Sequence, residues 1–306
     1  MASFSACSPL ELPHKLSLKV AYQGVPGAYS ELAARTACPG CFTLPCRTLS
    51  SAVLAVESGE ADRAVLPVES TMDGTALRNY DLLLRHDVRV AREITLFVRY
   101  CLLAMPGVHK AALRRVMSHP VALAHCGRAL ARLGVDREPV EDTAGAVRLL
   151  STRRMFDAAA IASARAGEIC GLDVIDEGVQ DEAWNTTRFL IVSRDGEVGV
   201  ARAPKKTSMV VAHARDDAMA MLRRVLSAFA SRGVNLTKLE VVGGDGVVVR
   251  KGRRLRAFAR VMVVDFEGSV EEEENVREAV KEVEGSAAFV RVLGCYASDK
   301  TVYNLE

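Results

Sequence analysis

The sequence predicts an α/β protein in which a two-lobed unit is followed by a smaller domain of βαββαβ order. Three observations lead to this prediction. Short apolar runs alternate with helical stretches through the first two-thirds of the chain, these runs fall into two groups, and the composition changes near residue 200 before a new pattern begins. Because strands that alternate with helices are usually joined by crossover connections, we expect mostly parallel sheets.

The chain should open with a strand, a glycine turn and a helix. Residues 18–23 alternate in polarity as a half-buried strand does, Gly24 and Gly27 interrupt the pattern, and residues 30–36 have helical character. Further strands are expected at five apolar runs, which are residues 63–67, 99–105, 115–117, 158–162 and 189–192. Their division into two groups indicates two lobes.

A linker should separate the lobes from the last domain, because residues 198–206 are rich in Gly, Ala, Pro and Lys and Pro204 stops regular structure. The elements expected after it are strand 207–212, helix 218–232, strands 236–242 and 256–266, helix 270–284 and strand 287–293. This is the ferredoxin-like βαββαβ order. The predicted boundaries are an extension at 1–17, the lobed domain at 18–197, the linker at 198–206, the last domain at 207–296 and a tail at 297–306.

Two runs of charge are interpreted as structural. The basic run 250–256 lies between two expected strands, which is typical of a solvated hairpin tip. The acidic run 271–274 opens a helix, where negative side chains interact favourably with the positive end of the helix dipole.

The composition favours small-molecule ligands. Hydrophobic residues make up 49% of the chain, charged residues make up 25%, and the net charge is +2, which is too small to favour nucleic acid as a main partner. No apolar run approaches the roughly 18 residues needed to span a bilayer, so no membrane association is expected. Residues 1–19 contain no arginine and resemble neither a secretory signal nor a full transit peptide.

The eight cysteines are mostly spread singly, which suits a reducing compartment. Cys38 and Cys41 have C-x-x-C spacing, but a zinc site needs a second ligand pair and a redox site needs a thioredoxin-like context. We therefore expect no metal and no other cofactor.

Several polar motifs stand where strands end and helices begin, which is where ligands bind in open α/β sheets. The turn at residues 24–30 lacks a phosphate-loop pattern, yet its glycines and N–H groups could hold a carboxylate; an ordinary βα turn is the alternative. Residues 66–75 offer hydroxyls and two acids after a buried strand. Ser118-His-Pro120 and Asp142-Thr-Ala144 are either ligand contacts or helix caps.

The segment Asn185-Thr-Thr-Arg-Phe189 is the most suggestive of chemistry. A guanidinium can bind a carboxylate through two hydrogen bonds, and a neighbouring hydroxyl can pass a proton to a leaving group. By itself the motif has little specificity.

Taken together, the motifs resemble the prephenate dehydratase family, and Asn235-Leu-Thr-Lys238 after a helix resembles its C-terminal ACT domain. Residues 79–86 and 291–294 look like the plant branch, whose members prefer arogenate. The segments that carry the resemblance, which covers residues 18–295, are Gly24-Val-Pro-Gly-Ala-Tyr-Ser30, Leu66-Pro-Val-Glu69, Asp73-Gly-Thr75, Ser118-His-Pro120, Cys126, Asp142-Thr-Ala144, Ala160-Ile-Ala-Ser163 and Thr187-Arg-Phe189.

The resemblance implies a bilobed fold like a type II periplasmic binding protein, with a cleft in which arogenate or prephenate loses carbon dioxide and its ring hydroxyl without a cofactor. Thr187 would act as the general acid, and Arg188 would lie near a substrate carboxylate or anchor the lobe interface; Phe189 completes this catalytic motif. The substrate-binding residues implied are Gly27, Ala28, Tyr29, Ser30, Glu69, Ser70, Thr75, Ser118, His119, Thr143 and Asn185.

The chain also departs from the family pattern. Ser70, Val121 and Tyr100 replace a usual Asn, Gln and His, which could lower activity or alter substrate choice. The ACT-type loops read Asp216-Asp217-Ala218 and Glu240-Val-Val-Gly243, so phenylalanine should be a weak effector. The degenerate effector residues implied are Ala218, Met219, Asn235, Leu236 and Glu240.

The resemblance further implies a homo-oligomer formed through the ACT domains and a location in the chloroplast stroma. Two alternatives remain open from the residues. One is a non-catalytic homologue that binds an aromatic amino acid in a regulatory complex, and the other is a solute-binding protein.

Overall fold

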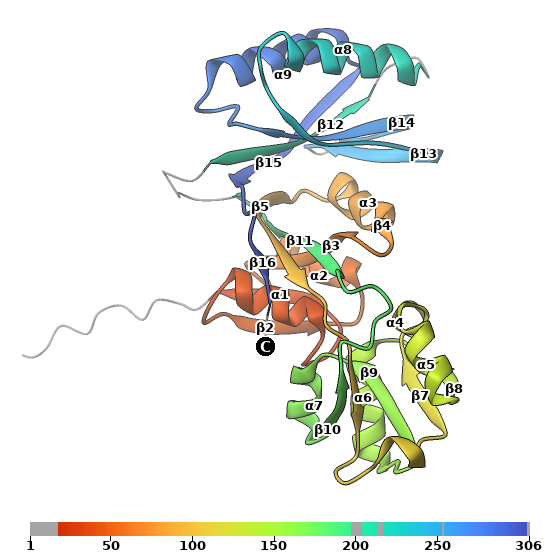
Figure 1. The fold of residues 1–306 in the computed structure, drawn as a ribbon. Coiled ribbons are helices and arrows are strands. Elements are labelled where there is room, and N and C mark those ends of the chain that lie inside the picture. The colour runs from red at the N-terminus through yellow and green to blue at the C-terminus, as the bar shows by residue number, and fades with distance from the viewer. Residues whose placement is uncertain (1–17, 197–203, 213–216, 253, 305–306) are drawn as a thin grey trace, which may run out of the picture.

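The computed structural model describes residues 18–196, 204–212, 217–252 and 254–304, which form three stacked parts (Figure 1). The first lobe lies in the middle, the second lobe lies below it and the C-terminal unit lies above it. The predicted extension at 1–17 and most of the predicted linker lie outside the described residues.

The first lobe is a seven-stranded sheet in the order β16-β5-β11-β3-β1-β2, with β4 paired to β3. Alanines of α1 (Tyr29–Ala37) and apolar residues of the strands form the core on one face, while α2 (Leu49–Ser58) and α3 (Leu77–Arg85) pack on the other. The strands are β1 (Lys19–Gln23), β2 (Phe42–Cys46), β3 (Arg63–Ser70), β4 (Gly74–Thr75), β5 (Arg89–Phe97), β11 (Thr186–Ser193) and β16 (Val302–Tyr303).

The second lobe is a five-stranded sheet in the order β10-β6-β9-β7-β8. Its strand β9 (Ala158–Ala162) is fully buried, which explains its uninterrupted apolar sequence. The other strands are β6 (Cys101–Ala104), β7 (Arg115–Ser118), β8 (Asp136–Pro139) and β10 (Asp173–Glu177). The helices are η1 (Lys110–Ala112), α4 (Pro120–His125), α5 (Gly127–Leu133), α6 (Thr143–Arg153) and α7 (Ala164–Cys170).

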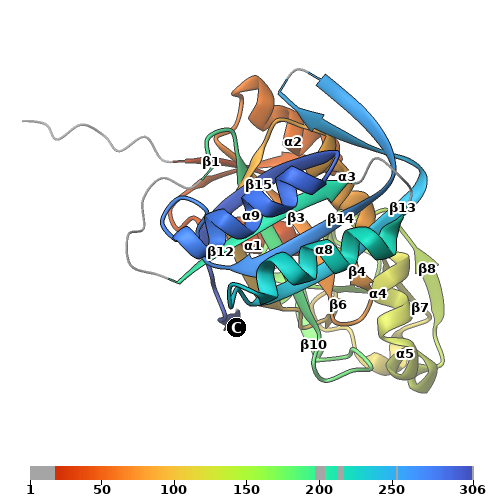
Figure 2. The same cartoon turned by 90° about the horizontal axis from the view of Figure 1, so that it is seen from above.

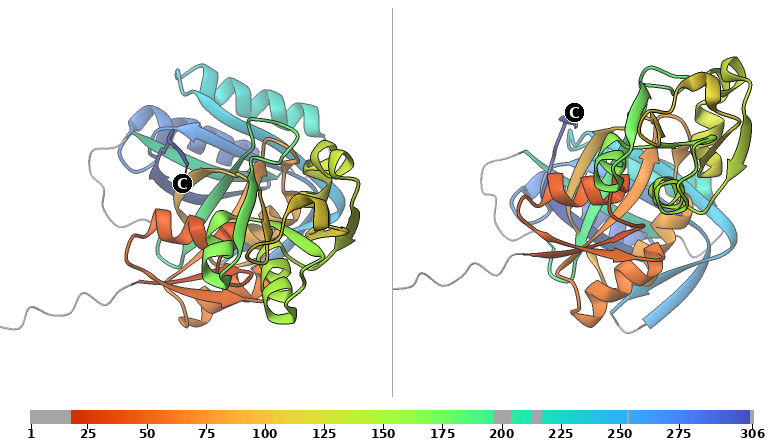
Figure 3. Two further views of the ribbon diagram at one scale, coloured as in Figure 1. Left: turned by 60° about the horizontal axis from the view of Figure 1, so that its bottom comes forward. Right: turned by 90° about the horizontal axis from the view of Figure 1, so that it is seen from below.

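Two segments connect the lobes. The chain leaves the first lobe through residues 98–100 and returns through residues 178–185. Figure 3 shows the yellow and green elements of the second lobe beside the red and orange elements of the first. Two lobes were predicted, but the expectation of mostly parallel sheets is wrong. Strand β11 returns from the second lobe and runs antiparallel between β3 and β5, and β6 runs antiparallel to β9.

The C-terminal unit has the predicted βαββαβ order. Its sheet order is β13-β14-β12-β15, and both helices, α8 (Ala218–Ala230) and α9 (Glu274–Ser286), cover the same face (Figure 2). The strands are β12 (Lys205–Ala212), β13 (Leu236–Lys251), β14 (Arg254–Glu267) and β15 (Phe289–Ala297). The predicted hairpin at 250–256 joins β13 to β14, but both strands extend into this range, and Arg250 is not at a solvated tip because it bonds Glu57 of α2 at 3.2 Å.

The other face of this sheet packs on the first lobe. One apolar core joins Val210, Val263 and Tyr296 of the C-terminal unit to Leu190 and Val68 of the lobe. The predicted tail is not a free end, because its residues Val302 and Tyr303 form β16 and pair in parallel with β5. No helix in the described part of the chain is long and apolar enough to cross a membrane.

Candidate active site

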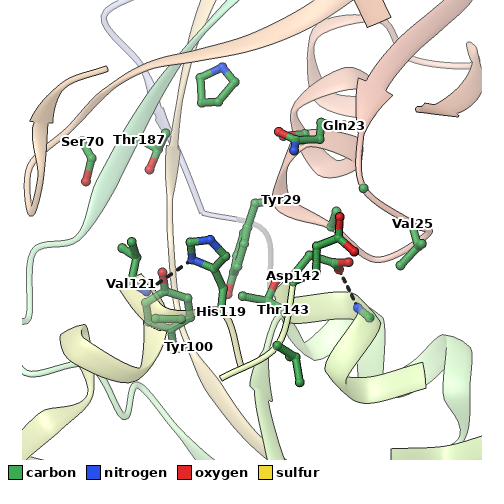
Figure 4. Close-up of a pocket in the computed structure, with 18 of the residues that line it drawn as sticks. Gln23, Val25, Tyr29, Ser70, Tyr100, His119, Val121, Asp142, Thr143 and Thr187 are labelled. Carbon is green, nitrogen blue, oxygen red and sulfur yellow. Dashed lines mark hydrogen bonds between the residues drawn. The ribbon is translucent and has the colours of Figure 1, made fainter. Parts of the chain in front are cut away.

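A cleft of about 1190 Å³ lies between the two lobes (Figure 4). The first lobe lines it with the turn after β1, the end of β3 and the start of β11, and the second lobe lines it with α4 and the first turns of α6. The cleft lies where the strands of both lobes end and the helices begin, which is where ligands bind in open α/β sheets. The polar motifs of the sequence stand at the same places.

Thr187 lines the cleft beside Ser70, its partner in the ladder between β11 and β3. Figure 4 places their hydroxyls on one side of the cavity, facing His119 and Tyr100. Within the described part of the chain the Thr187 side chain makes no hydrogen bond, so its hydroxyl is available to a ligand. Ser70 Oγ accepts the N–H groups of Met72 and Asp73 at 3.1 and 3.3 Å, which leaves its proton to donate.

Glu69 and Thr75 line the same wall but also bond the C-terminal unit. Lys238 Nζ lies 2.5 Å from Glu69 Oε1, and Thr75 Oγ1 donates to Glu240 Oε2 at 3.0 Å. Burial acts to raise the pKa of Glu69, but the positive charges of Arg188 and Lys238 outweigh it and lower that pKa below its usual range. Glu69 is therefore an anion suited to anchoring rather than a proton donor.

The second lobe supplies to the cleft two of the residues expected to bind substrate, His119 and Thr143. His119 Nδ1 accepts the Val121 N–H at 3.3 Å, which orients the ring into the cavity. Asp142 caps α6 by accepting the Gly145 N–H at 2.6 Å, so Thr143 is held in the first turn of that helix.

Four more of the predicted contacts line the cleft, namely Ala28, Tyr29, Ser30 and Asn185. Tyr29 donates its hydroxyl to the Arg99 carbonyl at 2.7 Å, and burial raises the pKa of this phenol well above its usual value. The amide of Asn185 donates to the Val98 carbonyl at 3.1 Å, so it holds the two connecting segments together.

Gly27 does not line the cleft, and its predicted role in binding a substrate carboxylate is wrong. Its N–H already donates to Glu31 Oε2 at 2.7 Å, and its carbonyl accepts Ser163 Oγ at 2.7 Å. Its φ is +94°, and a Cβ there would lie 2.7 Å from Ala166 Cα. Glycine is needed here because the lobes approach each other closely.

Ser118 and Phe189 are also buried away from the cleft. Ser118 is 0% exposed, and its hydroxyl donates to the Ile161 carbonyl at 2.6 Å, which ties β7 to β9. Phe189 packs in the apolar core beneath α1. Both were expected near substrate, but their strands direct them inward.

Arg188 does not line the cleft, so the first of its two predicted positions, near a substrate carboxylate, is wrong; it anchors an interface instead, the one with the C-terminal unit rather than the one between the lobes. Alternation along β11 puts it on the face opposite Phe189. Its guanidinium lies 2.7 Å from Glu93, 2.9 Å from Asp265 and 3.3 Å from Glu69, and it is 11% exposed. It anchors the interface between the first lobe and the C-terminal unit.

The proposed effector residues do not come together within one chain. Ala218 and Met219 begin α8, whereas Asn235 and Leu236 follow its far end, about 20 Å away at 1.5 Å per residue. Met219 is 72% exposed, Asn235 bonds Glu267 at 3.1 Å and Leu236 packs on the core. Glu240 bonds Thr75 and so points toward the first lobe.

The sequence reasoning missed several cleft residues, including Gln23, Asn79, His125 and Arg148. Gln23 ends β1 and could have been found by its place at a strand end. His125 lies between Pro120 and Cys126, two residues of the motifs already singled out, and its imidazole could have marked it as a candidate cleft residue. Asn79 and Arg148 lie on helices, and no local pattern separates them from other surface residues. Among the described residues, no cluster of three or more His, Cys, Asp or Glu could hold a metal ion.

Fold and cleft together define a two-lobed small-molecule-binding protein with a C-terminal βαββαβ unit. Residues 20–197 match the family model described as prephenate dehydratase. The chain is 45% identical over 309 aligned residues to arogenate dehydratase 3, chloroplastic, of Arabidopsis thaliana, an alignment that covers 99% of this chain and 72% of that protein.

Two solved structures share the fold. One is prephenate dehydratase from Arthrobacter aurescens in complex with L-Phe, with a TM-score of 0.79, 26% identity, and coverage of 92% of this chain and 90% of that one. The other is GqqA, described as a novel type of quorum-quenching acylase, with a TM-score of 0.78, 32% identity, and coverage of 92% and 98%. The chain belongs to the prephenate dehydratase family, which confirms the resemblance found in its motifs.

Proposed function

We propose that the protein is an arogenate/prephenate dehydratase that uses the Thr187 hydroxyl as its proton donor. The observation that carries the proposal is the place of Thr187, whose unbonded hydroxyl lines a cleft of about 1190 Å³ beside Ser70 and opposite His119. The GqqA structure shares the fold at 32% identity, against 45% for the plant arogenate dehydratase, so dehydration is the better-supported activity.

In the proposed reaction, the bond between the ring and its carboxylate breaks and releases carbon dioxide. The electron pair of that bond enters the ring, and the C–O bond to the ring hydroxyl breaks at the opposite carbon. Thr187 donates a hydrogen bond to the departing oxygen and passes it a proton, directly or through water, so that water leaves. A proton from solvent then restores the threonine hydroxyl, which balances the reaction. A threonine hydroxyl is a weak acid, so stabilisation of the developing negative charge must supply much of the effect.

This elimination neither oxidises nor reduces the substrate, and it requires no cofactor. Arogenate would yield phenylalanine, and prephenate would yield phenylpyruvate. The similarity to plant arogenate dehydratases favours arogenate as the substrate and the chloroplast stroma as the location. His119, Ser70 and Thr143 would hold the polar groups of the substrate from both sides of the cleft.

The C-terminal unit would act as an ACT-type sensor that pairs with the same unit of a second chain, and the lobes would be of the type II periplasmic-binding-protein class. Apolar side chains on α8 and the edge strand β13 support this pairing, since Met219, Leu226, Leu239 and Val241 are 72%, 41%, 36% and 39% exposed. Pairing would also bring Ala218 of one chain toward the start of β13 in the other.

The experiment that tests the proposal is incubation of the purified protein with arogenate and prephenate separately, with phenylalanine and phenylpyruvate measured as products. Faster formation of phenylalanine from arogenate is the expected result. Conversion of neither substrate, together with tight binding of an aromatic amino acid, would support the non-catalytic alternative instead.

A further inference from the structure

A side-chain contact joins the two lobes at the cleft, on the side where Ser70 lies. Nε2 of His125 lies 2.9 Å from Oδ1 of Asp73. Asp73 stands in the turn between β3 and β4 of the first lobe, and His125 is the last residue of α4 in the second lobe. Both side chains line the cleft. We call this contact the Asp73–His125 bridge.

The surroundings of His125 suit a directed hydrogen bond. Its side chain is 11% exposed, and its ring lies 6.2 Å from the Tyr100 ring, centroid to centroid. Its Nδ1 is buried and has no hydrogen-bond partner among the described residues. The tautomer with the proton on Nε2 therefore donates to Asp73 and leaves only a bare nitrogen on the buried side.

Asp73 is linked to Thr187 through Ser70. The Asp73 N–H donates to Ser70 Oγ at 3.3 Å, and Ser70 pairs with Thr187 in the sheet. On the other lobe, the helix that ends at His125 also carries Ala122 and follows His119, both of which line the cleft. Movement of either end of the bridge would therefore move a wall of the cleft.

The two edges of the cleft are built differently. Figure 4 shows Val25 and Gln23 on one side and Ser70 and Val121 on the other. On the Val25 side the lobes meet at Gly27 through tight backbone contact. On the Ser70 side the bridge consists of two side chains, which can separate without breaking a strand or a helix.

We propose that Asp73 and His125 are positioning residues whose bridge closes the cleft over the substrate beside Thr187. The inference rests on the proposed dehydratase function. Because the bridge stabilises the closed arrangement, its loss reduces the fraction of protein that is competent to hold substrate. The Michaelis constant should therefore rise more than the turnover number falls.

The test is a double-mutant cycle with His125→Ala, Asp73→Ala and the double variant. Each single change should lower kcat/KM about tenfold, as expected for a lost hydrogen bond to a charged group, mainly through KM. The double variant should be no worse than either single one. His125→Gln keeps an N–H donor and should restore kcat/KM to within about threefold of the unchanged protein.

A matched control is His86→Ala, because His86 Nδ1 lies 2.9 Å from Glu57 Oε2 in a bond of the same kind and length outside the cleft. This variant should keep its KM. Additive effects of the two alanine changes, or a glutamine variant no better than the alanine variant, would overturn the proposal.

Hydrogen exchange of the substrate-free protein provides a measurement that does not depend on activity. Amides in residues 70–76 and 119–126 should exchange faster in His125→Ala than in His125→Gln, because an opened cleft exposes both segments. Equal exchange in the two variants overturns the proposed bridge. If the unchanged protein converts neither arogenate nor prephenate, the proposed function fails, and the exchange result still decides the bridge.

Discussion

The two faces of strand β11 differ in what their polar residues do. Thr187 faces the cleft with a hydroxyl that no other described residue bonds, whereas Arg188 faces the C-terminal unit and contacts Glu69, Glu93, Asp265 and the Tyr296 hydroxyl. The first arrangement leaves a group available to a ligand, and the second satisfies a buried charge. Adjacent residues of one motif therefore face the cleft and the interface with the C-terminal unit separately.

The largest expected effect is on stability and comes from the Arg188 face. Arg188→Met should lower the free energy of unfolding by about 3–5 kcal/mol, because Glu93 and Asp265 would remain buried without this partner. Urea unfolding followed by circular dichroism measures this change in the free energy of unfolding. As a control, Arg85→Ala removes an exposed pair with Asp81 and should cost about 0.5 kcal/mol or less. Equal midpoints for the two variants would contradict the interface role.

The Thr187 face should respond in rate rather than in stability. Thr187→Val should lower kcat roughly a hundredfold, about 3 kcal/mol by analogy with a lost oxyanion donor, and change KM much less. Steady-state kinetics with both substrates measures this. Arg188→Lys sharpens the comparison, because it should reduce stability while leaving kcat within a few-fold. Near-normal kcat in folded Thr187→Val would rule out the Thr187 hydroxyl as the proton donor.

A smaller effect on stability is expected when the pH is lowered, because Glu31 supports the contact between the lobes around Gly27. Burial acts to raise the pKa of Glu31, but the Gly27 N–H and Arg35 outweigh it and lower that pKa. A lowered pKa in the folded state gives stability that is present above the unfolded pKa, near 4.3, and lost as the pH falls through the folded value. Melting temperatures between pH 3 and 6 should therefore depend less on pH in Glu31→Gln than in the unchanged protein. Parallel curves would argue against this role.

Phenylalanine should bind and inhibit weakly, because the segment Asp216-Asp217-Ala218 lacks the glycine that would allow close backbone approach. Calorimetry and rate assays with added phenylalanine measure both quantities. Strong inhibition at micromolar phenylalanine would mean that Ala218 and the segment 241–243 still form a working site. It would also show that the interface between the C-terminal unit and the first lobe transmits the effect of phenylalanine to the cleft.

The smallest expected effect concerns metals. Turnover should be unchanged after dialysis against a chelator, because the proposed elimination uses groups of the protein alone. Activity that is lost on dialysis and restored by a metal ion would contradict this expectation.

The sequence predicted well where the signal is local. Hydrophobic alternation located β1, short apolar runs located β7 and β9, and the order of strands and helices after Thr207 predicted the C-terminal unit. The motifs identified the family because their residue types and their order along the chain can be recognised without any knowledge of the fold. They also led to Thr187, Ser70, His119 and Thr143, since polar residues at strand ends and helix starts tend to face ligands.

Tertiary structure alone decided which members of each motif reach the cleft. Strand alternation turns Arg188 away from Thr187, but only the docking of the C-terminal sheet gives its guanidinium Asp265 as a partner. Gly27 and Ser118 lie in motifs that touch the cleft, yet their polar groups bond Glu31 and Ile161. The Asp73–His125 bridge joins residues 52 positions apart on different lobes. Local patterns contain no information on such contacts, because they depend on how the lobes and the C-terminal unit pack against one another.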